Sequence, residues 1–245
     1  YIGQMFGWRA TFWGVSLLGV IAFVGIAALL PSNLSRAEPA RLIDQVRVLG
    51  SGRLLIVFGM TAFGYGGTFV TFTYLSAVLQ DITGFSESSV SLILVAYGLA
   101  IAVGNLAGGR IADRNPVRAL TILFALQAVT LVIFTFTAVS PILAVITLAA
   151  LGFLQFANVP GLQLYVVQLA KLHRPGGVDV ASALNIAAFN LGIAIGAWVG
   201  GIVVSSSLGL SATPWVAALL VAFAIGLTMI SGALDRRSDN ALQTA

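Results

Sequence analysis

The composition lacks most of the groups that catalysis and metal binding use. The sequence of 245 residues contains no cysteine, one histidine and one lysine, and only 8% of it is charged. The absence of cysteine excludes disulfide bonds, a thiol nucleophile and any cysteine-ligated metal. The one histidine, His173, stands beside Arg174 in a polar loop, and a single histidine without cysteine partners argues against zinc. We therefore expect no metal site and no cofactor. No apolar run combines a nucleophile with a base, so we expect no enzyme activity either.

Hydrophobic residues dominate what is present. They make up 59% of the chain, and the mean hydropathy is +1.03, which is outside the range of soluble domains. A helix needs about 20 apolar residues to cross a hydrocarbon layer about 30 Å thick. Seven runs are long enough, so the sequence predicts an all-α, polytopic membrane protein with seven transmembrane helices. The runs cover residues 10–30, 54–79, 88–109, 119–138, 141–168, 180–206 and 214–234.

Helix-start signals precede several of these runs. Ser140 and Thr213 are each followed by proline, which is the pattern of an N-cap residue and a proline at the first helical position. Ser86 is a third expected N-cap. Residues 36–49 place apolar side chains on one face and charged ones on the other, which favours a helix lying on the membrane surface over an ordinary polar linker.

Basic residues gather on one side of the membrane. Eleven of the twelve Arg and Lys residues follow the first, third, fifth or seventh run, and the other side carries only Arg9. Cytoplasmic loops hold the excess of Arg and Lys in membrane proteins. We therefore expect the N-terminus outside and the C-terminus in the cytoplasm. Because the basic residues lie at the ends of spans, the net charge of +4 does not indicate nucleic-acid binding.

The loop after the third run concentrates charge. Four charged residues fall within nine positions, namely Arg110, Asp113, Arg114 and Arg118. The arginines alone would be explained by the positive-inside rule. The Gly-Arg-x-x-Asp-Arg arrangement that begins at Gly109 favours a structured gating element instead. In such an element, Asp113 would pair with a neighbouring arginine or cap a helix N-terminus.

Three stretches resemble one transporter family. Gly109-Arg110-Ile111-Ala112-Asp113-Arg114 resembles the G-x-L-A-D-R loop motif of the major facilitator superfamily, in the copy between its eighth and ninth helices. Residues 6–13 resemble the entry to the sixth helix in the drug:proton antiporter branch. Residues 183–192 are similar to the eleventh helix of arabinose-efflux-type permeases in that branch. The resemblance covers nearly the whole chain in order, although Asn115-Pro116 replaces the usual G-R-(R/K) continuation of the loop motif.

The resemblance implies that the seven helices correspond to the sixth through twelfth of a twelve-helix fold. Residues 1–30 would be the last helix of the N-terminal half, and 31–53 a cytoplasmic central loop with an amphipathic helix. Residues 54–234 would form the C-terminal six-helix bundle, and 235–245 a cytoplasmic tail. The first five helices would belong to an N-terminal half that is missing here, as would the glycine-proline motif that identifies antiporters of this branch.

Polar and aromatic side chains within the spans are the candidate substrate-binding residues. Four in the second run recur on one helical face, and by resemblance this is the seventh helix, which lines the central cavity. Three amides in the fifth run flank Pro160, and amides are costly to leave facing lipid. The candidates are Thr61, Tyr65, Thr68, Phe72, Gln155, Asn158, Gln163, Asn185 and Phe189. The alternative is that the threonines bond to their own helix, the aromatics face lipid and the amides merely join helices.

A stripe of small residues marks the sixth run. Gly192, Gly196 and Gly200 follow Ala188 at intervals of four, and such a stripe lets another helix approach closely. No Asp, Glu, Lys, Arg or His lies well inside any run, although such groups are the usual proton carriers. If protons are the coupling ion, their carboxylate is expected in the missing half.

The resemblance implies secondary active transport. The chain would be part of an exporter whose substrates are sugars or small amphiphilic drugs. The exporter would work by proton antiport and alternating access in a bacterial inner membrane. Its partners would be the substrate, protons, the lipid bilayer and the N-terminal half. Two alternatives remain, a seven-span receptor or photoreceptor and a non-catalytic membrane subunit. A photoreceptor needs a lysine buried in a span for its retinal, whereas Lys171 lies at a loop edge.

Overall fold

The computed structural model describes residues 5–30 and 47–243, with side chains described as far as Arg237. All regular structure in these residues is helical, and seven helices are long and apolar enough to cross a membrane. The all-α fold with seven spans is thus confirmed. The expected surface helix over residues 36–49 lies outside the described residues, except for a final helical turn from Arg47.

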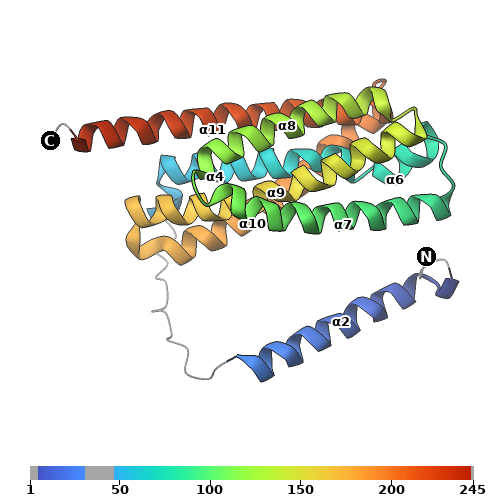
Figure 1. Cartoon of the computed structure of the whole chain (residues 1–245), viewed down its shortest axis with the longest axis horizontal. Coiled ribbons are helices and arrows are strands. Elements are labelled where there is room, and N and C mark those ends of the chain that lie inside the picture. Colours follow the sequence, from blue (N-terminus) through green and yellow to red (C-terminus); the bar gives the residue numbers. More distant parts are fainter. Residues whose placement is uncertain (1–4, 31–46, 244–245) are drawn as a thin grey trace. The chain divides into compact units, whose positions relative to one another are not determined.

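The chain divides into two units, residues 1–39 and 40–245. The first unit contains α2 (Trp8–Leu29), none of whose residues is buried. The second unit is a bundle of the remaining helices (Figure 1). Its elements are α4 (Gly52–Met60), η1 (Thr61–Tyr65), η2 (Gly66–Thr68), α5 (Phe69–Phe72), α6 (Leu75–Ala77), η3 (Val78–Ile82), α7 (Glu87–Ala112), α8 (Pro116–Thr137), α9 (Pro141–His173), η4 (Pro175–Gly177), α10 (Val178–Ser205), η5 (Leu210–Ala212) and α11 (Thr213–Gln243).

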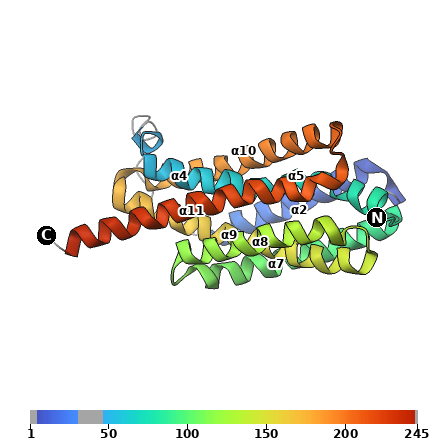
Figure 2. The same cartoon turned by 90° about the horizontal axis from the view of Figure 1, so that it is seen from above.

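Long helices pack side by side within the bundle. α7 lies along α9, and α8 packs against both α9 and α11 (Figures 1 and 2). The segment from α4 to α5 packs against α10 and α11. Large apolar side chains fill the space between these helices, and Phe124, Phe134 and Met60 are fully buried. This packing encloses the second span: two thirds of the residues in its most apolar stretch are buried.

The second span is not a continuous α-helix. After Met60 the backbone passes through a π-helical segment, η1, and a 3-10 segment, η2, before α5 restores the α-helix. The interruption coincides with Gly64, Gly66 and Gly67, and glycine weakens a helix interior. A Cβ on Gly66 would overlap the backbone of Gly192 in α10, and one on Gly67 would lie 2.9 Å from Leu220 of α11. The glycines therefore let α10 and α11 approach closely where the α-helix is interrupted.

Helix ends differ from the sequence predictions in detail. Ser86 caps α7 as expected by accepting a hydrogen bond from the Ser89 amide at 3.4 Å. Ser140 precedes Pro141 at the start of α9, but its side chain forms no capping bond. Thr213 is the first residue of α11 and follows a 3-10 turn, and its hydroxyl donates to the carbonyl of Leu210. α11 extends to Gln243, so the expected tail from residue 235 is largely helical.

Candidate substrate-binding site

A chain of side-chain hydrogen bonds starts at the interrupted span. The Thr61 hydroxyl, in the first turn of η1, donates to Asn185 Oδ1 of α10 at 2.7 Å. Asn185 Nδ2 donates to Gln163 Oε1 of α9 at 3.0 Å, and Gln163 Nε2 donates to the hydroxyl of Ser182. Thr61 and Asn185 are fully buried, whereas Gln163 is half-buried. Three predicted candidates from three separate spans thus meet in one network.

A second chain starts one turn further along η1. The Gly64 carbonyl, within the π-helical segment, accepts from Gln127 Nε2 of α8 at 2.8 Å. Asn158 Nδ2 of α9 donates to Gln127 Oε1 at 2.9 Å. Both amides are fully buried, and Asn158 Oδ1 has no hydrogen-bond partner within the described part of the chain. An unpaired buried acceptor is costly, so this oxygen lowers the stability that the second chain contributes.

Gln155 has a different partner. The Tyr97 hydroxyl of α7 donates to Gln155 Oε1, and both side chains are buried. They line a cavity of about 10 Å³ together with Thr71, whose hydroxyl has no partner in the described structure. A cavity of this size holds about one water molecule. Gln155 therefore joins α9 to α7 and faces a space too small for an organic solute.

Aromatic rings surround Tyr65 at the end of η1. Its ring meets those of Phe156 and Phe189 edge-on, with centroids 5.5 and 4.9 Å apart, and that of Phe69 at 5.4 Å. These rings come from α5, α9 and α10, so the cluster bridges the same helices as the first hydrogen-bond chain. Tyr65 is buried, and its hydroxyl forms no hydrogen bond among the described residues.

The predicted polar face of the second span is divided by the interruption. Thr61 and Tyr65 point to α10, where they contact Asn185 and Phe189. The Thr68 hydroxyl donates to the Tyr65 carbonyl of its own helix at 2.6 Å. For Thr68, the alternative that the threonines bond to their own helix is therefore correct. Phe72 stacks on Tyr97 of α7, with centroids 5.5 Å apart. The four candidates do not form one continuous face, because π and 3-10 turns shift the angular spacing between them.

The glycine stripe of α10 lies against the interrupted span. Ala188 and the three glycines are buried. A Cβ on Gly192 or Gly196 would overlap the carbonyl of Ala62 or Gly66, and one on Gly200 would lie 2.6 Å from the carbonyl of Val70. Backbone therefore meets backbone along η1, η2 and α5. This close approach is what brings Asn185 within reach of Thr61.

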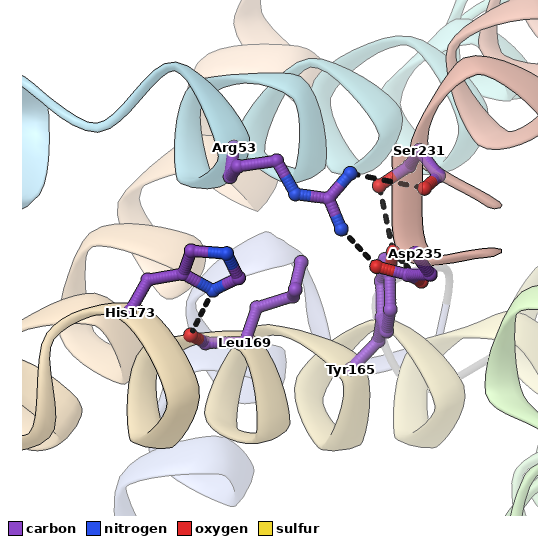
Figure 3. Close-up of polar contacts among 6 residues, drawn as sticks. All are labelled: Arg53, Tyr165, Leu169, His173, Ser231 and Asp235. Carbon is purple, nitrogen blue, oxygen red and sulfur yellow. Dashed lines mark hydrogen bonds and ion pairs between the residues drawn. The ribbon is translucent and has the colours of Figure 1, made fainter. Parts of the chain in front are cut away.

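An ion pair that the sequence did not reveal lies at the end of the bundle where α4 begins and α9 and α11 end. The Arg53 guanidinium pairs with the Asp235 carboxylate, and its Nη1 donates to the Ser231 carbonyl at 3.0 Å (Figure 3). The Tyr165 hydroxyl donates to Asp235 Oδ2 at 2.7 Å and lies 2.6 Å from the Ser231 hydroxyl. We name these four residues the basic-end cluster. No local pattern predicts this cluster, since Arg53 and Asp235 are 182 positions apart.

The loop motif is more open than expected. Asp113 is exposed at the end of α7, and within the described part of the chain it forms no ion pair. Asn115 caps α8 instead, by accepting from the backbone amide of Arg118 at 2.9 Å. Arg110 and Arg114 are also exposed, while Gly109 has open space around it. The expected local pairing of Asp113 is therefore absent among the described residues, and the expected capping of the next helix is done by Asn115, which directly precedes Pro116. The gating role of this loop stays a prediction.

His173 and Lys171, which were expected in a loop, both lie in the last turn of α9. His173 ends α9, is exposed, and its Nδ1 lies 3.1 Å from the carbonyl of Leu169 (Figure 3). Lys171 is exposed in the last turn of the same helix. Among the described residues, no three His, Asp or Glu side chains gather into a group that would bind a metal ion.

The arrangement defines a class of protein. A membrane-spanning helix interrupted in mid-span by π and 3-10 turns, with buried amides and aromatic rings converging there, has the features of a functional site and resembles the interrupted helices of membrane transporters. The comparison with known families agrees with this class. The family model of the Major Facilitator Superfamily matches residues 1–178 and 54–242, so the chain belongs to this superfamily.

Curated relatives extend the comparison. The chain is 50% identical over 206 residues to the uncharacterized MFS-type transporter YtbD of Bacillus subtilis, an alignment that covers 84% of this chain and 52% of that protein. It is 31% identical to a probable sugar efflux transporter of Helicobacter acinonychis, covering 83% and 51%. It is 28% identical to a chloramphenicol resistance protein of Streptomyces lividans, covering 81% and 50%. The chain spans about half the length of the curated relatives that it matches.

Proposed function

We propose that this chain is the C-terminal part of a secondary active transporter that exports small molecules by alternating access. The interrupted second span is the observation that carries the proposal. Transporters place their substrate sites near the bilayer midplane, at broken helices whose backbone groups are free to bind. Here the Gly64 carbonyl in the interruption accepts from Gln127 of α8, and Tyr65 lies among the aromatic rings of three elements.

The chemistry of the site favours sugars or small amphiphilic drugs as substrates. Aromatic rings bind apolar faces of a solute, and a tyrosine hydroxyl and half-buried amide add directional hydrogen bonds. Tyr65, Phe189 and Gln163 supply these groups on neighbouring elements. The names of two relatives, a sugar efflux transporter and a chloramphenicol resistance protein, are consistent with both substrate classes. Asn158 and Gln155 then act mainly by holding α9 in place.

Protons are the proposed coupling ion, and the N-terminal half of the whole protein is the proposed source of the coupling carboxylate. Arg53 and Asp235, the charged members of the basic-end cluster, stand at the ends of their spans rather than within them. The excess of basic residues supports a cytoplasmic location for this end by the positive-inside rule, and the proposed membrane is a bacterial inner membrane.

Tyr65→Phe tests the site. In inverted vesicles that contain the full-length protein, we expect the KM for an exported sugar or drug to rise about 3- to 10-fold. This corresponds to the loss of one hydrogen bond, about 0.5–1.5 kcal/mol. Thermal stability should not change, because Tyr65 Oη bonds no described residue. Gln155→Ala and Asn158→Ala should raise KM and lower thermal stability together, because each leaves a buried partner unpaired.

Tyr97→Phe is the matched control, since it removes a hydroxyl that bonds to Gln155. Like Gln155→Ala, it should lower thermal stability together with any rise in KM, whereas Tyr65→Phe should raise KM alone. Equal KM values for Tyr65→Phe and the parent protein would place the substrate elsewhere. Absence of any uptake driven by a pH gradient would overturn proton antiport.

A further inference from the structure

A groove runs between α8 and α11 at the end of the bundle where the basic-end cluster lies. Its volume is about 800 Å³, within the range of about 300–1,000 Å³ that is common for sites of small molecules. Arg118 and Arg236 line it, together with apolar side chains that include Ile122, Met229 and Ile230. These three apolar side chains are 49, 61 and 53% exposed, so the groove opens outward rather than into the core.

The charge of the groove is positive. Arg118 and Arg236 are exposed, and neither guanidinium has a carboxylate partner within the described residues. Asp235 also borders the groove, but Arg53 and Tyr165 already hold its carboxylate. Two uncompensated guanidinium groups therefore remain, and guanidinium is well suited to bind phosphate oxygens.

The position of these arginines matches a membrane interface. Arg118 is the third residue of α8, and Arg236 stands two positions beyond Leu234, the last residue of the apolar run of α11. At about 1.5 Å per residue, each lies within about one helical turn of the span's end. The same seam between α8 and α11 continues as an almost wholly apolar depression of about 390 Å³ that includes Val132 and Leu219. A ligand of this seam thus needs an anionic head at one end and a long apolar body.

We propose that the groove between α8 and α11 binds an anionic phospholipid, with its phosphate at Arg118 and Arg236 and an acyl chain along the apolar seam. Basic pockets between transmembrane helices are suited to anionic headgroups. A soluble anion would leave the exposed apolar walls unused, and a zwitterionic lipid would return a positive charge to a site that already has two. The bound lipid would bridge two helices, one of which carries Asp235 of the basic-end cluster.

Native mass spectrometry of the purified full-length protein in detergent tests the proposal. Phosphatidylglycerol and phosphatidylcholine with identical acyl chains are titrated separately. We expect at least tenfold tighter binding of phosphatidylglycerol. Arg118→Gln/Arg236→Gln should weaken it about 30-fold, equivalent to about 2 kcal/mol, at about 1 kcal/mol per arginine and 1.4 kcal/mol per factor of ten.

Two further variants separate the groove from general charge. Arg114→Gln/Arg237→Gln removes the same charge from the same helix ends, but neither residue lines the groove. We expect less than about threefold weakening for this control. Ala233→Trp fills the groove without changing charge and should weaken binding about tenfold or more. If the double variant in the groove does not fold, the single variant Arg236→Gln, at an exposed helix end, should still show about fivefold weakening.

Three results would overturn the proposal. The first is equal weakening by the two double variants, which would indicate only a diffuse charge effect. The second is equal binding of the two lipids. The third is protection against heat by inorganic phosphate alone to the same extent as by phosphatidylglycerol, which would identify a site for a free anion.

Discussion

Removal of one charge from the basic-end cluster should loosen three helices at once. Asp235→Asn keeps the size of the side chain but removes the negative charge that Arg53 of α4 and Tyr165 of α9 both contact. The Arg53 guanidinium would remain, and its Nε already lacks a partner in the described structure. An arginine that is largely buried without its counter-ion is costly.

The exposure of the pair sets the magnitude. Breaking a fully buried ion pair costs about 3–5 kcal/mol, and a surface pair is worth about 0–1 kcal/mol. The Arg53 and Asp235 side chains are 15% and 32% exposed, so the pair lies between these limits. We expect Asp235→Asn to destabilise the bundle by about 2 kcal/mol. For a domain of this size, that corresponds to a fall in Tm of about 4–8 °C.

Thermal unfolding in detergent, followed by circular dichroism, measures this effect. Arg237→Gln is the control, because it changes an exposed charge on the same helix two positions away. A double-mutant cycle with Arg53→Gln isolates the pairwise energy. The reasoning is refuted if Asp235→Asn unfolds at the same temperature as Arg237→Gln, or if the two single effects add within about 0.5 kcal/mol.

Two further predictions concern topology and packing. Cysteines introduced singly, as Ser86→Cys, Asn115→Cys and Ser207→Cys, should react with an impermeant reagent in intact cells only at the first and third positions, because the basic loops belong in the cytoplasm; the reverse pattern contradicts the orientation. Gly196→Leu should lower Tm by forcing the backbone of η2 away from α10, whereas Ala194→Leu, on the exposed side of the same helix, should not. Equal Tm values for these two variants would show that the glycine stripe does not control packing.

Local sequence signals predicted the features that local forces determine. Apolar runs of sufficient length marked all seven spans, because crossing a bilayer depends mainly on the length and hydropathy of each segment. The prediction of Ser86 as an N-cap was correct for the same reason, since its hydroxyl accepts from a backbone amide only three residues away. Ser140 and Thr213 formed no such bond, although a proline follows each of them. The proline fixes where a helix can start, but not how its first amides are satisfied.

Features that depend on distant contacts were not predicted. The shared face assigned to Thr61 and Phe72 assumed a regular α-helix, and the glycines at positions 64, 66 and 67 were the available signal that it breaks. Asp235 was assigned to a cytoplasmic tail, and no local pattern indicates its partner Arg53, which lies at the opposite end of the bundle's sequence. Asp113 was favoured for pairing or capping, although Asn115 directly precedes Pro116 and so has the same N-cap and proline pattern as Ser140 and Thr213; this local signal was overlooked.

The interrupted span connects the elements that a transport cycle would have to move. η1 bonds to α10 through Thr61 and to α8 through the Gly64 carbonyl, and α9 joins both chains through Gln163 and Asn158. At about 1 kcal/mol for each hydrogen bond, a displacement of η1 that breaks one bond in each chain costs about 2 kcal/mol. A solute that bonds Tyr65 and replaces one lost partner offsets about half of that cost. Coupling between sites requires an element with two arrangements of similar free energy. The π-helical segment is well suited to be that element, because its alternative is the regular α-helix that its neighbours α4 and α5 already adopt.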